Sequence, residues 1–438
     1  MGGIILAGTS SNSGKTTITI GLLRALYNRN VNVIGAKVGP DYIDPAFHAK
    51  ACHKDCVNLD MWAMDNACIN SQISYIQSRG DVAIIEGVMG LFDGAADGTA
   101  STAHVARKTR YPIILVVDVF GQSTSIAATV KGFAELEDDI TISGVILNRT
   151  GSPTHTKILT DALTKYVPHI PYLGALPRQD EVVLESRHLG LVQADEISDL
   201  DSLLEASAKW IETHIDVDTL LKLTKNTVCE TPTKPTPIAP LGKHIAIAKD
   251  PAFNFIYPHI IHGRENAGVE ISYFSPLKNE APNPHADSVY LAGGYPELYA
   301  QTLSSNGVFK DAMHIFAGQD KPIFGECGGF MVLGEALINA SGVSHPMLNL
   351  LPVITSFEKK KIHLSYRKIT TLTHSPFGKK GTVLKGHEFH YASIVSQHRT
   401  PDTQDFFNIE DALGGKQEIA GLKKGSVYGS YMHLIDTL

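Results

Sequence analysis

Long apolar segments and basic clusters are both missing from this chain of 438 residues. No stretch of about 18 apolar residues occurs, so we expect no membrane-spanning helix and no membrane partner. The amino-terminal apolar run is too short for a secretory signal peptide and no cationic segment precedes it, which favours the cytoplasm. The net charge is −7 and no long basic run occurs, so a nucleic-acid partner is not expected.

Cysteine is also scarce, with five residues in the whole chain. An odd number without a secretory signal argues against a disulfide framework. Cys52 and Cys56 form a CxxxC segment, but no second pair accompanies it, and a structural zinc ion normally needs four ligands. We therefore expect no zinc site there. With 43% hydrophobic and 19% charged residues, the composition is that of a globular protein with enough chain for two cores.

The first half of the sequence alternates short apolar runs with helical patterns. Such runs are expected of strands buried on both faces, and helices between them indicate βαβ units and a parallel sheet. The expected strands are Gly3–Ala7, Val31–Lys37, Asp81–Glu86, Ile113–Asp118, Ile142–Asn148 and one near Pro171–Leu176. The expected helices include Lys15–Asn28, Ser123–Leu136 and one near Ser198–His214.

A proline-rich segment precedes a second βα series. Residues 231–240 read TPTKPTPIAP, with four prolines in ten residues, which favours an extended linker over the alternative of a long surface loop. The strands expected after it are His244–Ala248, Val269–Phe274, Ser288–Leu291 and Pro322–Gly325. We predict one α/β domain over residues 1–225, a linker over 226–242 and a second α/β domain over 243–438.

The segment GTSSNSGKTT, residues 8–17, follows the first expected strand and opens a helix, which is the context of a P-loop. Its backbone N–H groups can surround phosphate oxygens, Lys15 can reach the β- and γ-phosphates, and the Thr16 hydroxyl can coordinate Mg²⁺. The motif departs from the usual spacing, because Thr9 stands where the first glycine is expected. Asn148 ends a later strand and could read the adenine edge. The residues expected to bind ATP are Gly8, Thr9, Ser10, Asn12, Ser13, Gly14, Lys15, Thr16, Thr17 and Asn148.

Acidic residues follow the ends of neighbouring strands, in the segments GPDYIDP, VAIIEG and GLFDGAADG. The carboxyl ends of parallel strands meet at one edge of a sheet, where ligands bind, and Mg²⁺ prefers oxygen ligands. Any one of these acids could instead be a solvated loop residue. The residues expected to hold Mg²⁺ are Thr16, Asp41 and Glu86. Those expected to serve substrate binding or phosphoryl transfer are Asp41, Tyr42, Asp44, Asp93 and Asp97.

The segment KPIFGECGGFMVL, residues 321–333, has the pattern of a nucleophile elbow with cysteine in place of serine. Cys327 would sit at a helix N-terminus, which favours the thiolate. Its base should be a distant histidine, and His433 in YGSYMHLID is the candidate. His387 and His390 in GHEFHY resemble a metal pair, but HEFH is one residue short of the HExxH spacing. The N–H groups expected to form an oxyanion hole belong to Gly293, Gly294 and Gly328.

Together these segments resemble the cobyrinate or hydrogenobyrinate a,c-diamide synthases of the cobalamin pathway, over the whole chain. The first half resembles the dethiobiotin-synthetase type of P-loop fold, and the second half resembles class I glutamine amidotransferases. The segments that carry the resemblance are KVGPDYIDPAFH, NLDMWAM, EGVMGLFDGAADG, GGYPELYA, FGECGGFMVLGE, GHEFHY and GSYMHLID.

The resemblance implies an enzyme that uses ATP, Mg²⁺ and L-glutamine on a corrin-ring polycarboxylate. ATP would phosphorylate the a and c side-chain carboxylates, and ammonia released from glutamine by Cys327 and His433 would convert them to amides. DGAADG and GSYMHLID favour hydrogenobyrinate as the substrate, with cobyrinate as the alternative. Class I amidotransferases continue from the histidine as His-Pro-Glu, whereas this chain has Leu434 and Ile435, so no carboxylate is assigned to His433. A homodimer is left open.

Two other readings remain open at this stage. In the first, the chain is a P-loop switch protein whose second domain is only a scaffold, and glutaminase activity would exclude it. In the second, a dethiobiotin-synthetase-like carboxylase is fused to an inactive amidotransferase, and incorporation of ammonia from glutamine would exclude that.

Overall fold

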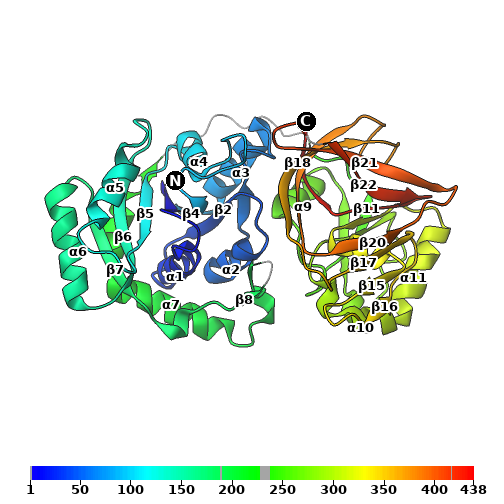
Figure 1. The fold of residues 1–438 in the computed structure, drawn as a ribbon, viewed down its shortest axis with the longest axis horizontal. Coiled ribbons are helices and arrows are strands. Elements are labelled where there is room, and N and C mark those ends of the chain that lie inside the picture. Colours follow the sequence, from blue (N-terminus) through cyan, green and yellow to red (C-terminus); the bar gives the residue numbers. More distant parts are fainter. Residues whose placement is uncertain (1, 188–189, 227–236, 416) are drawn as a thin grey trace. The chain divides into compact units, whose positions relative to one another are not determined.

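The chain folds into two units, each with a main β-sheet, in the computed structural model, which describes residues 2–187, 190–226, 237–415 and 417–438 (Figure 1). Unit 1 comprises Met1–Trp62 and Asn66–Pro235, and unit 2 comprises Ala63–Asp65 and Thr236–Leu438. The linker predicted over 226–242 falls largely on residues 227–236, which lie outside the described residues. Among the described residues, no helix combines the length and the apolar character needed to cross a bilayer.

The sheet of unit 1 has the strand order β3-β2-β4-β1-β5-β6-β7, and all of these neighbours are parallel. β1 is apolar and buried throughout, and β5 is apolar and buried up to Asp118, as parallel strands covered on both faces should be. The strands are β1 (Gly2–Gly8), β2 (Val33–Val38), β3 (Val57–Leu59), β4 (Val82–Gly90), β5 (Ile113–Asp118), β6 (Ile142–Thr150) and β7 (Tyr172–Pro177), with β10 (Lys225–Asn226) antiparallel to β1. A separate two-stranded ladder pairs β8 (Ser186–Arg187) with β9 (Gly190–Leu191).

Helices connect these strands, and α1 packs against α2 and α7. The helices of unit 1 are α1 (Lys15–Asn28), α2 (Ile43–Cys52), α3 (Asn66–Arg79), α4 (Thr102–Thr109), α5 (Ile126–Glu135), α6 (Pro153–Tyr166), α7 (Leu200–His214) and α8 (Val217–Leu223), with short 3-10 turns η1 (Asp180–Val182) and η2 (Ala194–Glu196). The α/β fold class is confirmed, and the predicted helix Lys15–Asn28 has the observed bounds. The predicted strand Asp81–Glu86 is shorter than β4, which continues to Gly90.

The main sheet of unit 2 is mixed, with the order β12-β11-β13-β14-β23-β22-β21-β18-β19-β24. Its first five strands are parallel and the later pairs are antiparallel. The strands are β11 (His244–Ala248), β12 (Glu270–Phe274), β13 (Ser288–Leu291), β14 (Ile323–Glu326), β18 (His363–Thr371), β19 (Val383–His390), β21 (Thr403–Asp411), β22 (Gln417–Lys424), β23 (Val427–Ser430) and β24 (Met432–Thr437).

A second, four-stranded sheet of unit 2 has the order β16-β15-β17-β20. Its strands are β15 (Ala336–Ile338), β16 (Ser344–Pro346), β17 (Val353–Ser356) and β20 (Ser393–Gln397). The helices of this unit are α9 (Pro258–Asn266), α10 (Ala300–Ser305), α11 (Gly307–Gly318) and α12 (Gly328–Leu333), with turns η3 (Pro276–Lys278) and η4 (Pro296–Leu298). The parallel strands that precede α12 were predicted from the sequence, whereas the parallel strand β23 and the other strands after α12 were not.

Candidate active site

The P-loop lies between β1 and α1, as the sequence predicts. Gly8 ends β1 and leaves no room for a side chain, because a Cβ there would lie 2.2 Å from the Ser13 hydroxyl oxygen. This close approach explains why the glycine stands one residue upstream of the usual position. The Asn148 side-chain nitrogen donates to the carbonyl oxygen of Ser13 at 2.9 Å, so the end of β6 holds the loop.

A cavity of about 580 Å³ adjoins this loop within unit 1. Lys15, Thr16 and Thr17 line one side of it, and Asn148, with residues that follow β7, lines the remainder. The Asn148 amide is engaged internally, because its oxygen also accepts the backbone N–H of Arg149 at 2.9 Å. A role of Asn148 in reading adenine therefore remains a prediction, while its bond to the P-loop is a structural role that the sequence did not indicate.

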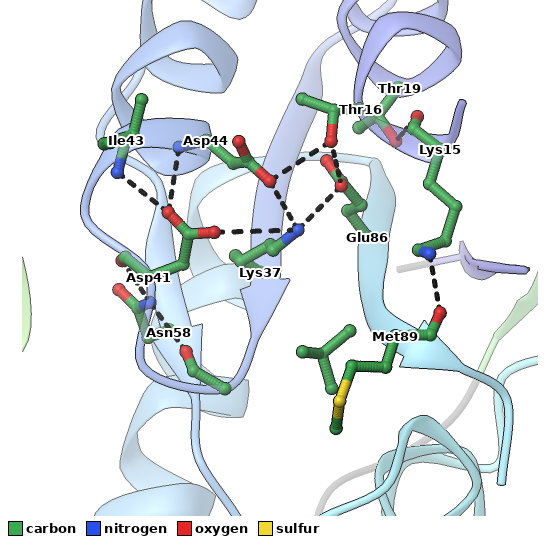
Figure 2. A network of polar contacts seen from close by, with 12 residues as sticks. Lys15, Thr16, Thr19, Lys37, Asp41, Ile43, Asp44, Asn58, Glu86 and Met89 are labelled. Atoms are coloured by element: carbon green, nitrogen blue, oxygen red, sulfur yellow. Dashed lines mark hydrogen bonds and ion pairs between the residues drawn. The ribbon is translucent and has the colours of Figure 1, made fainter. Parts of the chain in front are cut away.

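Lys15 begins α1 and folds back over the loop. Its ammonium nitrogen donates to the carbonyl oxygen of Met89 at 2.6 Å (Figure 2). It also donates to the carbonyl oxygen of Ser10 at 3.2 Å. Burial, followed by the nearby charge of Lys37, lowers the pKa of Lys15 to about 8. Met89 is the next-to-last residue of β4. Its φ of 45° is uncommon for a residue with a side chain. A phosphate at this position would supply the anion that Lys15 lacks.

The Thr16 hydroxyl contacts two carboxylates that come from different elements, as Figure 2 shows. This hydroxyl donates to Glu86 at 2.7 Å and lies 3.2 Å from an Asp44 oxygen. Glu86 comes from β4 and is fully buried, and Asp44 comes from the first turn of α2. The P-loop hydroxyl and two predicted acids therefore form one cluster of hard oxygen atoms. This donor set fits Mg²⁺.

Lys37 lies at the centre of this cluster and was not predicted as a site residue. Its ammonium nitrogen lies 2.6 Å from Asp44, 2.7 Å from Glu86 and 3.9 Å from Asp41. Burial opposes its charge, but the carboxylates of Asp44 and Glu86 raise the pKa of Lys37 well above its usual value. A lysine inside an otherwise apolar buried strand was the available sequence signal, since lysine is almost never fully buried without a partner.

His48 is a second residue that sequence reasoning missed. It is fully buried, and its Nε2 lies 2.7 Å from the second oxygen of Glu86. Burial would raise the pKa of Glu86, but the Lys37 charge and the His48 hydrogen bond hold it well below the usual range. His48 follows Asp44 by four residues on α2, so helical periodicity could have placed both on one face. The Cys56 sulfur lies 3.5 Å from His48 Nδ1.

The other predicted acids occupy different surroundings. Asp41 caps the start of α2 by accepting the backbone N–H groups of Ile43 and Asp44, at 2.8 and 3.1 Å. Tyr42 is the half-buried residue that precedes α2. Asp93 accepts the Gly90 N–H at 3.0 Å and so closes the turn after β4.

Asp97 is exposed, and its bonds run to its own loop and to a neighbouring one. It accepts the Thr99 N–H at 3.0 Å and the Trp62 indole N–H at 3.1 Å. Burial would raise the pKa of Asp97, but the hydrogen bonds from Thr99 lower this pKa below its usual value. The structure therefore brings Thr16 into direct contact with Asp44 and Glu86, whereas Asp97 bonds to Thr99 and Trp62.

The elbow of unit 2 forms where β14 ends and α12 begins. Cys327 has the backbone angles φ 48° and ψ −101°, which are rare for a residue with a side chain and typical of a strained nucleophile turn. It is buried, and its sulfur lies 3.6 Å from the carbonyl oxygen of Phe389 on β19. In the described part of the chain, Cys52, Cys56, Cys68 and Cys327 form no disulfide, and Cys229 lies outside it.

His433 on β24 is fully buried beside this cysteine. Burial disfavours its charged form, but the charge and hydrogen bond of Cys327, with the adjacent Glu326 carboxylate, raise the pKa of His433 to about 10. Its Nδ1 lies 3.3 Å from a Glu326 oxygen. The structure therefore brings the predicted nucleophile and base together, and it places beside them a carboxylate that the sequence reasoning did not assign.

The predicted oxyanion glycines adjoin this pair. A Cβ on Gly293 would lie 2.7 Å from His433 Cε1 and 3.4 Å from Cys327 Cβ, so only glycine leaves the imidazole in place. A Cβ on Gly328 would lie 3.1 Å from the Gly294 nitrogen, so these two residues are neighbours as well. Their role as N–H donors to an oxyanion remains a prediction.

The HEFH segment does not bring its two histidines together. His387 stacks on His433 with ring centroids 4.8 Å apart, and its Nε2 lies 2.8 Å from the Tyr257 hydroxyl. His390 instead lies near His363 and Glu388, and the ligand atoms of these three are within 4.8 Å of one another.

The Glu388 carboxylate already has a cationic partner in this cluster. The Arg367 guanidinium donates to it at 2.7 and 3.0 Å. Both ring nitrogens of His390 have hydrogen-bond partners. Nε2 lies 2.9 Å from a Glu388 oxygen, and Nδ1 lies 2.9 Å from the Ala392 carbonyl oxygen. The segment is therefore part of a hydrogen-bonded cluster next to the elbow.

Comparison with known proteins gives matches over both units. Residues 4–192 match the CobQ/CobB/MinD/ParA nucleotide binding domain, and residues 244–437 match the CobB/CobQ-like glutamine amidotransferase domain. Proteins named hydrogenobyrinate a,c-diamide synthase from Brucella anthropi and Brucella suis are each 48% identical, over 100% of this chain and 99% of their own length. A protein of the same name from a Sinorhizobium species is 45% identical with the same coverage.

Proposed function

Because the chain belongs to the family of hydrogenobyrinate a,c-diamide synthases, we propose that it converts the a and c carboxylates of hydrogenobyrinate to amides. ATP is cleaved in unit 1 and glutamine is hydrolysed in unit 2. The observation that carries this proposal is the presence, in one chain, of a P-loop with a buried carboxylate cluster and of a Cys327–His433 pair at a strained elbow.

The chemistry of unit 1 is activation of a carboxylate. The substrate carboxylate attacks the γ-phosphorus of ATP, the bond to the β-phosphate oxygen breaks, and an acyl phosphate and ADP form. Lys15 would neutralise charge on the transferring group, since its ammonium nitrogen already lies against carbonyl oxygens of the P-loop and of Met89. Thr16 and Glu86, with Asp41 through the oxygen that lies 3.9 Å from Lys37, would hold Mg²⁺, which would supply charge neutralisation at the phosphates. Asp44 and Lys37 would keep this cluster ordered.

The chemistry of unit 2 is release of ammonia. The Cys327 thiolate attacks the side-chain amide carbon of glutamine, and the Gly293, Gly294 and Gly328 region would receive the oxyanion. His433 gives its proton to the departing nitrogen, and the carbon–nitrogen bond breaks. Ammonia leaves, and the acyl group remains on Cys327 as a thioester. Water then hydrolyses the thioester to glutamate and returns the thiol. Ammonia attacks the acyl phosphate, the carbon–oxygen bond to phosphate breaks, and the amide forms.

Mass spectrometry tests the proposal and its substrate together. Hydrogenobyrinate and cobyrinate are incubated separately with the full-length protein, ATP, Mg²⁺ and amide-¹⁵N-labelled glutamine. We expect a doubly ¹⁵N-amidated product from hydrogenobyrinate. Preferential amidation of cobyrinate would move the substrate assignment to that branch, and the absence of ¹⁵N from both products would overturn the proposed function.

A further inference from the structure

Glu326, the residue before the elbow cysteine, contacts the base through a carboxylate that is held at both oxygens. One oxygen lies 3.3 Å from His433 Nδ1 and accepts the Tyr290 hydroxyl at 3.0 Å. The other accepts the backbone N–H of Leu434 at 3.1 Å. We infer that Glu326 is the positioning residue of the glutaminase site, which fixes the orientation and tautomer of His433. The inference rests on the proposed roles of Cys327 and His433.

The geometry explains how the carboxylate would act. A carboxylate at Nδ1 requires the proton on that nitrogen, so Nε2 is left to exchange a proton with Cys327. Glu326 is 3% exposed and His433 is fully buried, so water does not compete with this interaction. Because Tyr290 and Leu434 bind the two oxygens separately, the carboxylate cannot rotate away from the imidazole without losing a buried hydrogen bond.

Arg264 places a buried positive charge in the surroundings of Glu326. Arg264 on α9 is buried, and its guanidinium carbon lies 5.3 Å from the centre of the Tyr290 ring whose hydroxyl binds Glu326. Among the described residues, Arg264 Nε and Nη1 have no hydrogen-bond partner. Burial is the main cause that lowers the pKa of Arg264, and the charge of Glu326 is among those that oppose it. A buried anion is tolerated where such a cation lies nearby.

His387 is another polar side chain that faces His433, and it cannot serve the same purpose. Its ring lies nearly parallel to the His433 ring, at 11°, which is a stacking contact and not a hydrogen bond in the ring plane. Burial, followed by the charge of His433, lowers the pKa of His387 well below its usual value, so it carries no charge to hold an imidazolium. Of the groups placed around His433, Glu326 therefore has the geometry and the charge that the role requires.

The position of Glu326 differs from that expected of class I amidotransferases, in which the carboxylate follows the histidine by two residues. In this chain Ile435 occupies that place, and the carboxylate comes from the strand that carries the nucleophile. The same catalytic strand would then supply both the attacking sulfur and the group that orients its base.

The test uses the full-length protein and the variant Glu326→Gln, which keeps the shape and removes the charge. The matched control is Glu335→Gln, because Glu335 also pairs with a histidine of unit 2, at 3.0 Å from the exposed His398. Glutamine hydrolysis is measured as kcat and KM, and the thiol is alkylated with iodoacetamide across a pH series.

For Glu326→Gln we expect kcat to fall between about 10-fold and 100-fold, at the low end of what a well-placed base contributes. KM for glutamine should change by less than about 3-fold, since Glu326 does not bind substrate. The midpoint of the alkylation profile should rise, because His433 holds its proton less firmly and the thiolate is less stabilised. Glu335→Gln should match wild type in all three measurements.

Further variants separate the ways in which the inference could fail. Glu326→Asp keeps the charge, so it should restore the alkylation profile toward wild type, which a purely structural role of Glu326 would not predict. If Glu326→Gln does not fold, Tyr290→Phe provides the test. This variant removes the hydroxyl that donates to Glu326, so the carboxylate is held less firmly and kcat should fall with little change in KM. Wild-type kcat and alkylation in these variants would overturn the inference alone. Glutamine hydrolysis by Cys327→Ser would instead overturn the proposed function.

Discussion

Replacing Glu86 with glutamine removes one negative charge from the cluster around the Thr16 hydroxyl. The carboxylate has contacts of 2.7 Å to Thr16, to Lys37 and to His48. Lys37 keeps its second partner, because Asp44 lies 2.6 Å from the same ammonium. The protein should therefore still fold, with a loss of about 1–3 kcal/mol in the free energy of unfolding for a buried donor left unsatisfied.

The loss of activity should be larger than the loss of stability. Two unit charges about 4 Å apart interact by roughly 4 kcal/mol at an effective dielectric constant of 20, which corresponds to roughly 1000-fold in affinity. If Glu86 holds Mg²⁺ near the phosphates, amide synthesis by Glu86→Gln at millimolar Mg²⁺ should fall by about 100-fold to 1000-fold. Raising Mg²⁺ should restore part of it, since metal affinity is the property that is lost.

The assay is amide synthesis from ammonia, ATP and the corrin substrate over a Mg²⁺ series, with glutamine hydrolysis measured separately. Glutamine hydrolysis should continue, because it belongs to unit 2. Glu212→Gln is the control, since Glu212 is an exposed acid of unit 1 that pairs with Arg29 at 2.8 Å. Asp41→Asn should follow Glu86→Gln. Wild-type Mg²⁺ curves for both variants would refute this placement of the metal and direct attention to Asp44 and Asp93.

The remaining predictions concern the two reaction centres. Cys327→Ser should lose glutamine-dependent synthesis by orders of magnitude and keep ammonia-dependent synthesis, and an intact glutamine-dependent rate would contradict the nucleophile assignment. Lys15→Ala should lose both syntheses while glutamine hydrolysis persists, whereas normal amidation would mean that the loop is structural. Burial opposes the imidazolium of His433, but Cys327 raises its pKa to about 10 from 6.5, so the stabilisation is fully present below pH 6.5 and is lost as pH rises through about 10. Thermal denaturation of wild type and His433→Gln should accordingly converge across that window, and a difference that grows with pH would contradict it.

Local patterns explain which parts of the fold were predictable. The bounds of α1 follow from the sequence because the GKT motif marks its start and a continuous apolar pattern marks its length. The strands of unit 1 are apolar runs buried on both faces, which leave a clear signal. Most pairs among the strands after Leu333 are antiparallel, and several of these strands are half-buried, so their residues are mixed in polarity and leave a weaker signal in the sequence.

Site residues that belong to a sequence motif could be predicted, whereas residues that are brought together only by tertiary packing could not. Lys15, Thr16 and Cys327 follow from spacing alone. Lys37 and His48 act through pairs with Glu86 that join β2, α2 and β4, and such pairs are visible only once the strand order is known. The sequence did not indicate Glu326, because the carboxylate of class I amidotransferases follows the histidine. In this chain the contact to His433 comes instead from the end of β14.

Isotope transfer tests the central claim, that one chain activates a corrin carboxylate with ATP and amidates it with nitrogen from glutamine. Hydrogenobyrinate labelled with ¹⁸O in its carboxylates is incubated with ATP, Mg²⁺ and amide-¹⁵N-labelled glutamine, and both the phosphate and the corrin product are examined by mass spectrometry. An acyl phosphate leaves one carboxylate oxygen on phosphate for each amide formed, so the account predicts ¹⁸O in the phosphate and ¹⁵N in the product. Phosphate without ¹⁸O beside a ¹⁵N-labelled amide would contradict it.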